Sequence, residues 1–279
     1  MIERAFGEDG PVVPVIGQGT WRIDGAAREG AVAALRAGLD AGLRHIDTAE
    51  MYDGAEAIVA EAVAGRRDEV FLVSKVVPGN ASRKGVVAAC EASLHRLRTD
   101  RLDAYLLHWP GQHPIAETVA GFEALKAAGK ILSWGLSDFD VDELDDALRI
   151  AGPGAIACNQ VLYHLGERAI EHAVLPWCQR HGIAVVGYSP FGSGDFPDPA
   201  SAGGQVLATI AARHGTTPRG VALAFLTRLD GTFTIPKTVR AARAIENAAA
   251  GAVVLDETDL AQIEAAFPLG KRPRNLPML

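Results

Sequence analysis

The chain contains few cysteines, few aromatic residues and no excess of positive charge. Its three cysteines, Cys90, Cys158 and Cys178, are far apart and form no CxxC pair or set of metal ligands. This pattern argues against a disulfide framework and is typical of a reduced, cytoplasmic protein. The net charge of −7 argues against extensive binding to nucleic acid or to an anionic membrane surface.

Long apolar runs and a dinucleotide-binding glycine motif are also missing. No run approaches the roughly 18 apolar residues of a membrane-spanning helix, and the N-terminal "MIERAFGEDG" lacks the apolar stretch of a signal peptide. No G-x-G-x-x-G follows the first predicted strand, which argues against a Rossmann site. Without a repeat or a low-complexity linker, we expect one domain over residues 1–279.

The sequence does contain a regular alternation of short apolar runs and longer helical patterns. Most of the apolar runs are continuous, which is typical of parallel strands covered on both faces. Eight strands are predicted, at residues 13–21, 43–49, 70–76, 102–109, 131–138, 155–163, 183–190 and 232–237.

Helical patterns follow these runs, with Ser82 as a predicted N-cap of one of them. Strands that alternate with helices predict a closed (β/α)8 barrel, a fold of about 250 residues, with an open doubly wound sheet as the main alternative. Two additions are expected. Asp9-Gly10 predicts a β-hairpin that caps the barrel before the first strand, and residues 256–267, capped by Asp256, predict an extra C-terminal helix.

Reactive side chains fall at the ends of three successive predicted strands. Asp47 ends the second strand, Tyr52 follows five residues later, Lys75 lies near the end of the third strand, and His108 ends the fourth. Active sites of such barrels form where the strands end. A lysine inside an apolar strand needs a partner, and Asp47 on the neighbouring strand is the obvious one.

These four residue types suit proton transfer to a carbonyl oxygen. Tyr52 can donate the proton, Lys75 is expected to lower its pKa, Asp47 to hold Lys75, and His108 to orient the carbonyl. No nucleophile has an adjacent base, which argues against acyl transfer. His45 has no second histidine in an H-x-H pair, which makes a metal-dependent hydrolase the weaker alternative. A proton donor without a reductant implies that the protein binds a hydride cofactor.

At this point the sequence resembles the aldo-keto reductases. The segments "GLRHIDTAEMYDGAE", "LVSKV", "LLHWP", "GLSDF", "NQVLYH", "GYSPFGSG" and "IPKTVRAARAIEN" occur in that family's order over residues 12–267. "GQGTW", "NQVLYHLGERAIE" and "VLPWC" resemble the bacterial branch that contains methylglyoxal reductases. The resemblance implies a (β/α)8 barrel that reduces aldehydes or ketones with NADPH, without metal or flavin.

The resemblance also implies where the cofactor NADPH/NADP+ is bound. Ser137, Asp138 and Gln160 should hold the nicotinamide carboxamide, and Tyr188 should stack on the nicotinamide ring. Ser189, Phe191 and Ser193 should lie near the pyrophosphate. Lys237, Thr238 and Arg243 suit a ribose 2′-phosphate, and Glu246 and Asn247 can reach the adenine.

One residue departs from the family pattern, which usually has asparagine where this chain has Asp138. An ionised carboxylate only accepts hydrogen bonds, so we expect Asp138 to weaken NADPH binding and to favour the positively charged oxidised ring.

The substrate pocket is expected to be small and apolar, lined by Trp21, Met51 and Trp109. This pattern favours a small-molecule carbonyl substrate such as methylglyoxal, with a monomeric chain and no nucleic-acid or membrane partner. The alternative is a cofactor-binding regulator or sensor on the same barrel, with little turnover.

Overall fold

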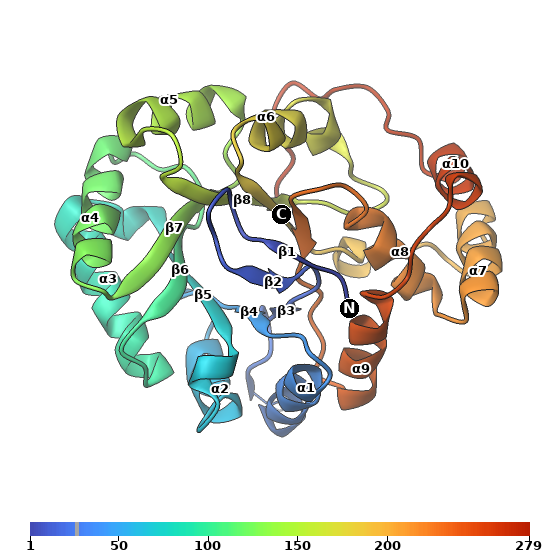
Figure 1. Ribbon diagram of the computed structural model, residues 1–279, viewed down its shortest axis with the longest axis horizontal. Helices are drawn as coiled ribbons and strands as arrows, with labels where there is room; N and C mark the ends of the chain where they lie inside the picture. The colour runs from blue at the N-terminus through green and yellow to red at the C-terminus, as the bar shows by residue number, and fades with distance from the viewer. Residues whose placement is uncertain (26–27) are drawn as a thin grey trace.

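A computed structural model describes residues 1–25 and 28–279 of the chain. Its centre is a sheet of eight parallel strands with helices around the outside (Figure 1). Neighbouring strands follow one another in chain order, as expected of repeated strand–helix units. The strands are β3 (Gln18–Gly19), β4 (His45–Asp47), β5 (Phe71–Val76), β6 (Leu102–Leu107), β7 (Ile131–Ser137), β8 (Ile156–Leu162), β9 (Ala184–Tyr188) and β10 (Thr232–Thr234).

The sheet closes on itself through backbone hydrogen bonds between its first and last segments. The N–H of Thr234 donates to the Val15 carbonyl at 2.8 Å, and the N–H of Gly17 donates to the Thr234 carbonyl at 2.8 Å. Further along, the N–H of Gly19 donates to the Pro236 carbonyl at 3.1 Å. The prediction of a closed (β/α)8 barrel is therefore confirmed, and the open doubly wound alternative is wrong.

The helices pack around the barrel, and most lie where the sequence predicts them. Ser82 caps α3 by accepting from the Gly85 N–H at 3.1 Å, and Asp256 caps the extra helix α10, both as predicted. The bounds are α1 (Arg28–Asp40), α2 (Ala55–Ala62), α3 (Arg83–Leu97), α4 (Ile115–Ala127), α5 (Val141–Ala151), α6 (Val174–Arg180), α7 (Ala202–His214), α8 (Pro218–Leu226), α9 (Ala241–Ala250) and α10 (Glu257–Ala266).

Two helices that follow β9, α7 and α8, were not predicted from the sequence. The signals were present, because Ser201 and Thr217 are N-caps whose side chains accept from the N–H groups of Gly204 and Gly220. Helix α7 stands at the periphery beside α10 (Figure 1). Arg213 of α7 pairs with Asp259 of α10 there.

The first predicted strand, at residues 13–21, is wrong as one element. Its first part forms β2 (Val12–Pro14), which pairs antiparallel with β1 (Glu3–Ala5), and its later part forms the barrel strand β3. The hairpin itself is confirmed, but its turn is centred on Glu8 and Asp9, because the Gly10 N–H donates to the Gly7 carbonyl at 3.4 Å. The left-handed φ of 89° at Gly7 permits this turn.

The hairpin closes the barrel bottom with an aromatic plug. The ring of Phe6 lies 4.7 Å from that of Phe71, 5.2 Å from that of Phe233 and 5.5 Å from that of His45, measured between centroids. Among the described residues, neither ring nitrogen of the fully buried His45 has a hydrogen-bond partner. Burial lowers the pKa of His45 to about 4, so the ring is neutral at pH 7.

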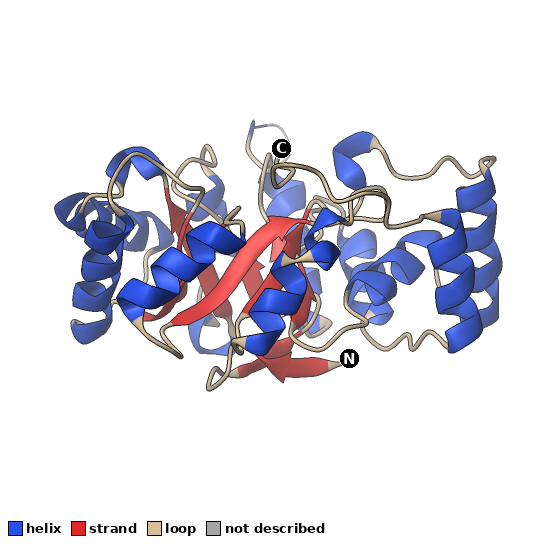
Figure 2. Cartoon of the chain, turned by 90° about the horizontal axis from the view of Figure 1, so that it is seen from above, coloured by secondary structure: helices blue, strands red, loops and turns tan. Residues whose placement is uncertain are grey.

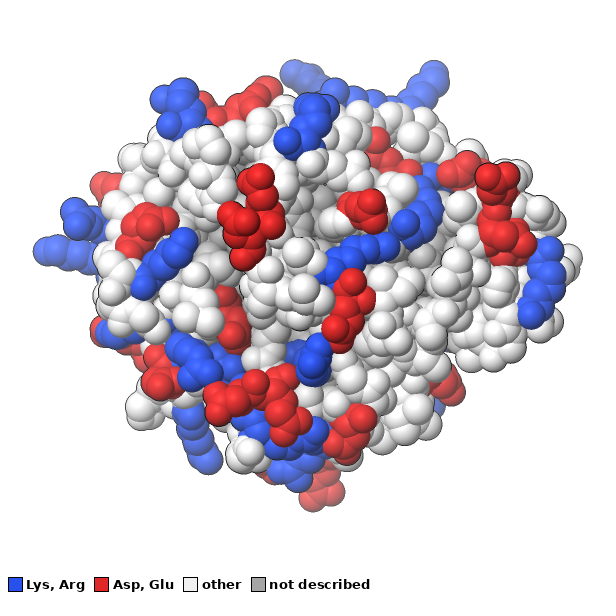
Figure 3. Space-filling view, viewed as in Figure 1, with Lys and Arg blue, Asp and Glu red and all other residues white. Residues whose placement is uncertain are grey.

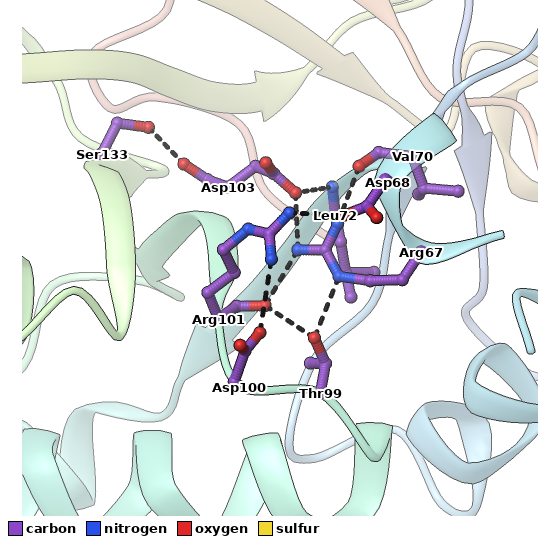
Figure 4. Close-up of polar contacts among 9 residues, drawn as sticks. All are labelled: Arg67, Asp68, Val70, Leu72, Thr99, Asp100, Arg101, Asp103 and Ser133. Carbon is purple, nitrogen blue, oxygen red and sulfur yellow. Dashed lines mark hydrogen bonds and ion pairs between the residues drawn. The ribbon is translucent and has the colours of Figure 1, made fainter. Parts of the chain in front are cut away.

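A polar network ties neighbouring strands together near their N-terminal ends (Figure 4). Arg67 donates to the Asp103 carboxylate at 2.8 Å, and the same carboxylate accepts from the Leu72 N–H at 2.8 Å. The Ser133 hydroxyl donates to the Asp103 carbonyl at 2.7 Å. The network therefore joins β5, β6 and β7 at the end of the barrel opposite to their C-terminal ends.

The two termini lie at opposite ends of the barrel (Figure 2). The hairpin end carries acidic and basic side chains that are interspersed over its surface (Figure 3). At the other end, the C-terminal segment crosses the side where the strands finish (Figure 2). Within residues 1–25 and 28–279, no helix has the length and apolar character needed to span a membrane.

The buried imidazole of His45 should limit stability in acid. A base whose folded pKa lies below its unfolded value of about 6.5 takes up its proton on unfolding, so stability falls as the pH drops toward 4. Over that interval the wild type should lose about 3 kcal/mol of unfolding free energy that His45→Leu retains. Urea unfolding at several pH values measures this difference. The exposed His113→Leu is the control, and equal acid slopes for wild type and His45→Leu would contradict the assignment.

Candidate active site

A buried ion pair joins the ends of β4 and β5. Lys75 and Asp47 are almost completely shielded from solvent, and the Lys75 ammonium donates to Asp47 Oδ1. The ammonium also donates to the Thr48 carbonyl at 2.9 Å, and Gln160 Nε2 donates to Asp47 Oδ2 at 2.8 Å. Parallel pairing places Asp47 opposite Val73. Side chains two residues apart on a strand point to the same face, so Lys75 points into the barrel as Val73 does, two residues nearer the C-terminal end of β5.

Tyr52 and His108 complete the predicted group of four. The Tyr52 hydroxyl lies 3.4 Å from His108 Nε2. The Lys75 ammonium lies 5.1 Å from the centroid of the Tyr52 ring. The β4–α2 loop and the end of β6 supply these two side chains, so residues from three successive strand ends meet at one point, as the sequence predicted.

Burial fixes the protonation of this group. It raises the pKa of Tyr52 overall, whereas Lys75 lowers that pKa, as the sequence predicted, without reversing the effect of burial. Burial alone would lower the pKa of Lys75, but Asp47 and Tyr52 raise it overall. Burial and the Lys75 charge lower the pKa of His108 to about 2. At pH 7 the site therefore holds a neutral phenol, an ammonium and a neutral imidazole.

The group faces a cavity of about 430 Å³ at the C-terminal end of the barrel. Three of its lining residues, Asp138, Ser189 and Ser193, adopt left-handed φ values of 58°, 51° and 52°. Backbone in this region is unfavourable for non-glycine residues and clusters at functional sites. Other predicted residues on the cavity wall are Trp21, Asp47, Met51, Tyr52, His108, Trp109, Ser137, Gln160, Tyr188, Phe191 and Lys237.

A second cavity of about 570 Å³ adjoins the first and shares Phe191 and Lys237 with it. Its remaining predicted lining residues are Thr238, Arg243, Glu246 and Asn247. We call the two adjoining cavities, which extend from Tyr52 and His108 to α9, the groove. Of the residues predicted for the site, Lys75 lies behind Asp47 and lines neither cavity.

Several lining residues of the two cavities were not predicted from the sequence. Met278 and Leu279 of the C-terminal segment lie on the wall of the first cavity. Arg219 lines the second, and its guanidinium lies over the rings of Phe191 and Phe196, at 5.5 and 4.6 Å from their centroids. No local pattern signals the tail contacts, but Arg219 could have been suspected from its place in the first turn of an N-capped helix.

Similarity to known proteins agrees with this geometry. The family model of the aldo/keto reductases matches residues 15–267. The chain belongs to the aldo/keto reductase family. Membership confirms the expectation of an NADP(H)-dependent oxidoreductase.

Individual relatives cover nearly the whole chain. Methylglyoxal reductase YeaE of Escherichia coli K12 is 44% identical over 271 residues, which is 96% of this chain and 95% of that protein. Glyoxal reductase of Bacillus subtilis is 32% identical and covers 92% of this chain and 90% of its own length. The crystal structure of a Klebsiella pneumoniae aldo-keto reductase in complex with NADPH superimposes with a TM-score of 0.92, 42% identity and complete coverage of both chains.

The Asp47–Lys75 pair should show strong energetic coupling. Each single variant, Asp47→Asn or Lys75→Met, leaves one buried charge without its partner and should lower the unfolding free energy by about 3–5 kcal/mol. The double variant removes both charges and should lose much less than the sum of the two. Urea unfolding of the four proteins measures the coupling.

The exposed pair Lys130–Glu91 provides the matched control for that cycle. Lys130→Met and Glu91→Gln should couple by at most about 1 kcal/mol, because solvent screens the pair. Additive losses at Asp47 and Lys75 would show that the buried pair does not hold the two strand ends together.

Proposed function

We propose that this protein uses NADPH to reduce small aldehydes, ketones or α-dicarbonyls such as methylglyoxal to alcohols, with Tyr52 as the proton donor. The observation that carries the proposal is the contact between the Tyr52 hydroxyl and His108 Nε2, 3.4 Å apart, on the wall of the catalytic cavity. The names of the E. coli and B. subtilis relatives support the substrate class.

The groove fits an extended dinucleotide with a phosphate at its far end. Lys237 and Arg243 lie on its wall, and within the described part of the chain neither forms an ion pair. Together with the Thr238 hydroxyl they suit the 2′-phosphate that distinguishes NADPH from NADH. In this arrangement the adenine lies by Glu246 and Asn247, which line the second cavity, and the nicotinamide lies in the first cavity, which is lined by Ser137, Asp138, Gln160 and Tyr188. When bound there, the cofactor supplies the hydride that reaches the carbonyl carbon.

The protein's own residues handle the oxygen of the substrate. The neutral His108 can hydrogen-bond the carbonyl oxygen and hold it beside the Tyr52 hydroxyl. As negative charge develops on that oxygen, Tyr52 gives up its proton to it. The Lys75 ammonium then stabilises the phenolate, and Asp47, held by Gln160, keeps the ammonium in place.

The substrate end of the cavity is small and largely apolar. Trp21 and Trp109 line it together with Met51, which is exposed, and Met278 adds a further apolar side chain from the tail. Such a pocket favours compact carbonyl compounds over large ones, because little apolar area is available for a long substituent.

Four further expectations belong to the same proposal. They are one functional unit over residues 1–279, a monomer, no macromolecular partner, and a cytoplasmic location. They rest on the composition, the absence of a linker pattern and the continuous groove. A sensor that binds the cofactor without turnover is the competing interpretation, and the Tyr52 experiment separates the two.

Replacing Tyr52 by phenylalanine should remove turnover and keep cofactor binding. Loss of a general acid should lower kcat by about 100- to 10,000-fold, whereas NADPH affinity should change little. NADPH oxidation is followed with a panel of aldehydes that includes methylglyoxal, and binding is measured by calorimetry. Tyr105→Phe, which loses a hydroxyl that faces neither cavity, is the control. Equal rates for wild type and Tyr52→Phe would overturn the mechanism, and no turnover by wild type would favour the sensor.

Removing the cationic groups at the far end of the groove should reduce the preference for NADPH over NADH. Lys237→Ala and Arg243→Ala should each weaken NADPH binding by about tenfold or more, and NADH binding far less, because each deletes a charge-assisted contact to phosphate. Arg240→Ala is the matched control, since this exposed arginine lies midway between the two in sequence and outside the lining. Parallel losses for both cofactors would remove the 2′-phosphate assignment.

A further inference from the structure

Asp138 is an acid in an unusual setting at the end of β7. Its backbone is left-handed, with φ of 58°, and its N–H donates to the Gln160 carbonyl at 2.8 Å. The Tyr188 hydroxyl donates to Asp138 Oδ2 at 3.3 Å. Among the described residues, no partner is found for the buried Oδ1 atom.

The position of Asp138 matters because it lines the catalytic cavity beside Gln160 and Tyr188. A buried carboxylate oxygen without a partner is unfavourable unless a ligand or a proton satisfies it. The left-handed backbone does not explain the acid, because asparagine adopts this conformation equally well without a charge.

We propose that Asp138 discriminates between the two redox states of the nicotinamide cofactor, binding the oxidised form in preference, and increasingly so as the pH rises through neutrality. The inference rests on the proposed function, since it places the nicotinamide at this end of the groove. It concerns the charge of the ring, which is positive in NADP+ and neutral in NADPH.

The protonation of Asp138 determines the direction in which the preference for NADP+ changes with pH. Burial raises the pKa of Asp138 to about 7, although the Tyr188 hydrogen bond and the charge of Lys75 both oppose that rise. Below this value the side chain is a neutral acid that resembles the amide of asparagine. Above it the carboxylate attracts a positive ring, so affinity for NADP+ increases relative to NADPH.

Several other groups face Asp138, and those with a shifted pKa keep one charge state across this range. They are Tyr188 of β9, Lys75 of β5 with its ion-pair partner Asp47 of β4, and Tyr52 of the β4–α2 loop. The pKa values of both tyrosines and of Lys75 are raised, and the neighbouring His108 is neutral. A 2′-phosphate, which titrates near pH 6, is present in both cofactor forms and cancels in their ratio.

The test compares the affinities for NADPH and NADP+ by calorimetry, without any substrate. For wild type, the ratio Kd(NADPH)/Kd(NADP+) should rise by about tenfold between about pH 5.5 and pH 8.5. For Asp138→Asn it should stay flat at the acidic value. The control is Asp140→Asn, two residues on, where the acid caps α5 outside the cavity and asparagine caps equally well; it should keep the wild-type profile.

Each outcome decides between two separate ideas. A wild-type ratio that does not change with pH, or an Asp138→Asn ratio that rises as wild type does, overturns the inference and leaves the reductase proposal intact. If neither NADPH nor NADP+ binds the wild type at any pH, the proposed function itself is overturned. Because the wild-type profile is informative alone, the inference can be tested even if Asp138→Asn does not fold.

Discussion

A single buried ion pair, between Lys75 and Asp47, constrains the arrangement of the active site. An ammonium group without solvent contact is unfavourable unless its donors are paired, and here a carboxylate and the Thr48 carbonyl accept from it. This requirement restricts the register between β4 and β5, because the Asp47 carboxylate must lie beside the Lys75 ammonium. Gln160 extends the constraint across the barrel by binding the second oxygen of Asp47.

The pair also determines what the neighbouring groups can do. Burial, together with this ammonium, lowers the pKa of His108 to about 2 and keeps the imidazole neutral, as its proposed role in orienting a carbonyl oxygen requires. Burial keeps Tyr52 protonated despite the adjacent positive charge. Tyr52 therefore keeps the proton that the proposed mechanism requires it to donate, and in that mechanism Lys75 contributes most once the phenolate has formed.

Much of this could be predicted from sequence because strand ends in a closed parallel barrel converge. Asp47, Lys75 and His108 could be assigned to one site from their places at the ends of three apolar runs, without any contact being known. The division of residues 13–21 into β2 and β3 could not, since it depends on pairing with β1 and with β10. The tail residues Met278 and Leu279 reach the cavity only through the folded path of the C-terminal segment. Where the site depends on such long-range contacts, local periodicity carries no signal.

The layer beneath the ion pair links stability to function. His45 lies two residues before Asp47 on β4, so strand alternation places both inside the barrel, with the imidazole packed between Phe6 and Phe71. Because burial lowers the pKa of His45 to about 4, this layer adds no second cation near the Lys75 ammonium at pH 7. The hairpin that supplies Phe6 completes the apolar packing beneath the pair, at the end of the barrel opposite to the candidate site.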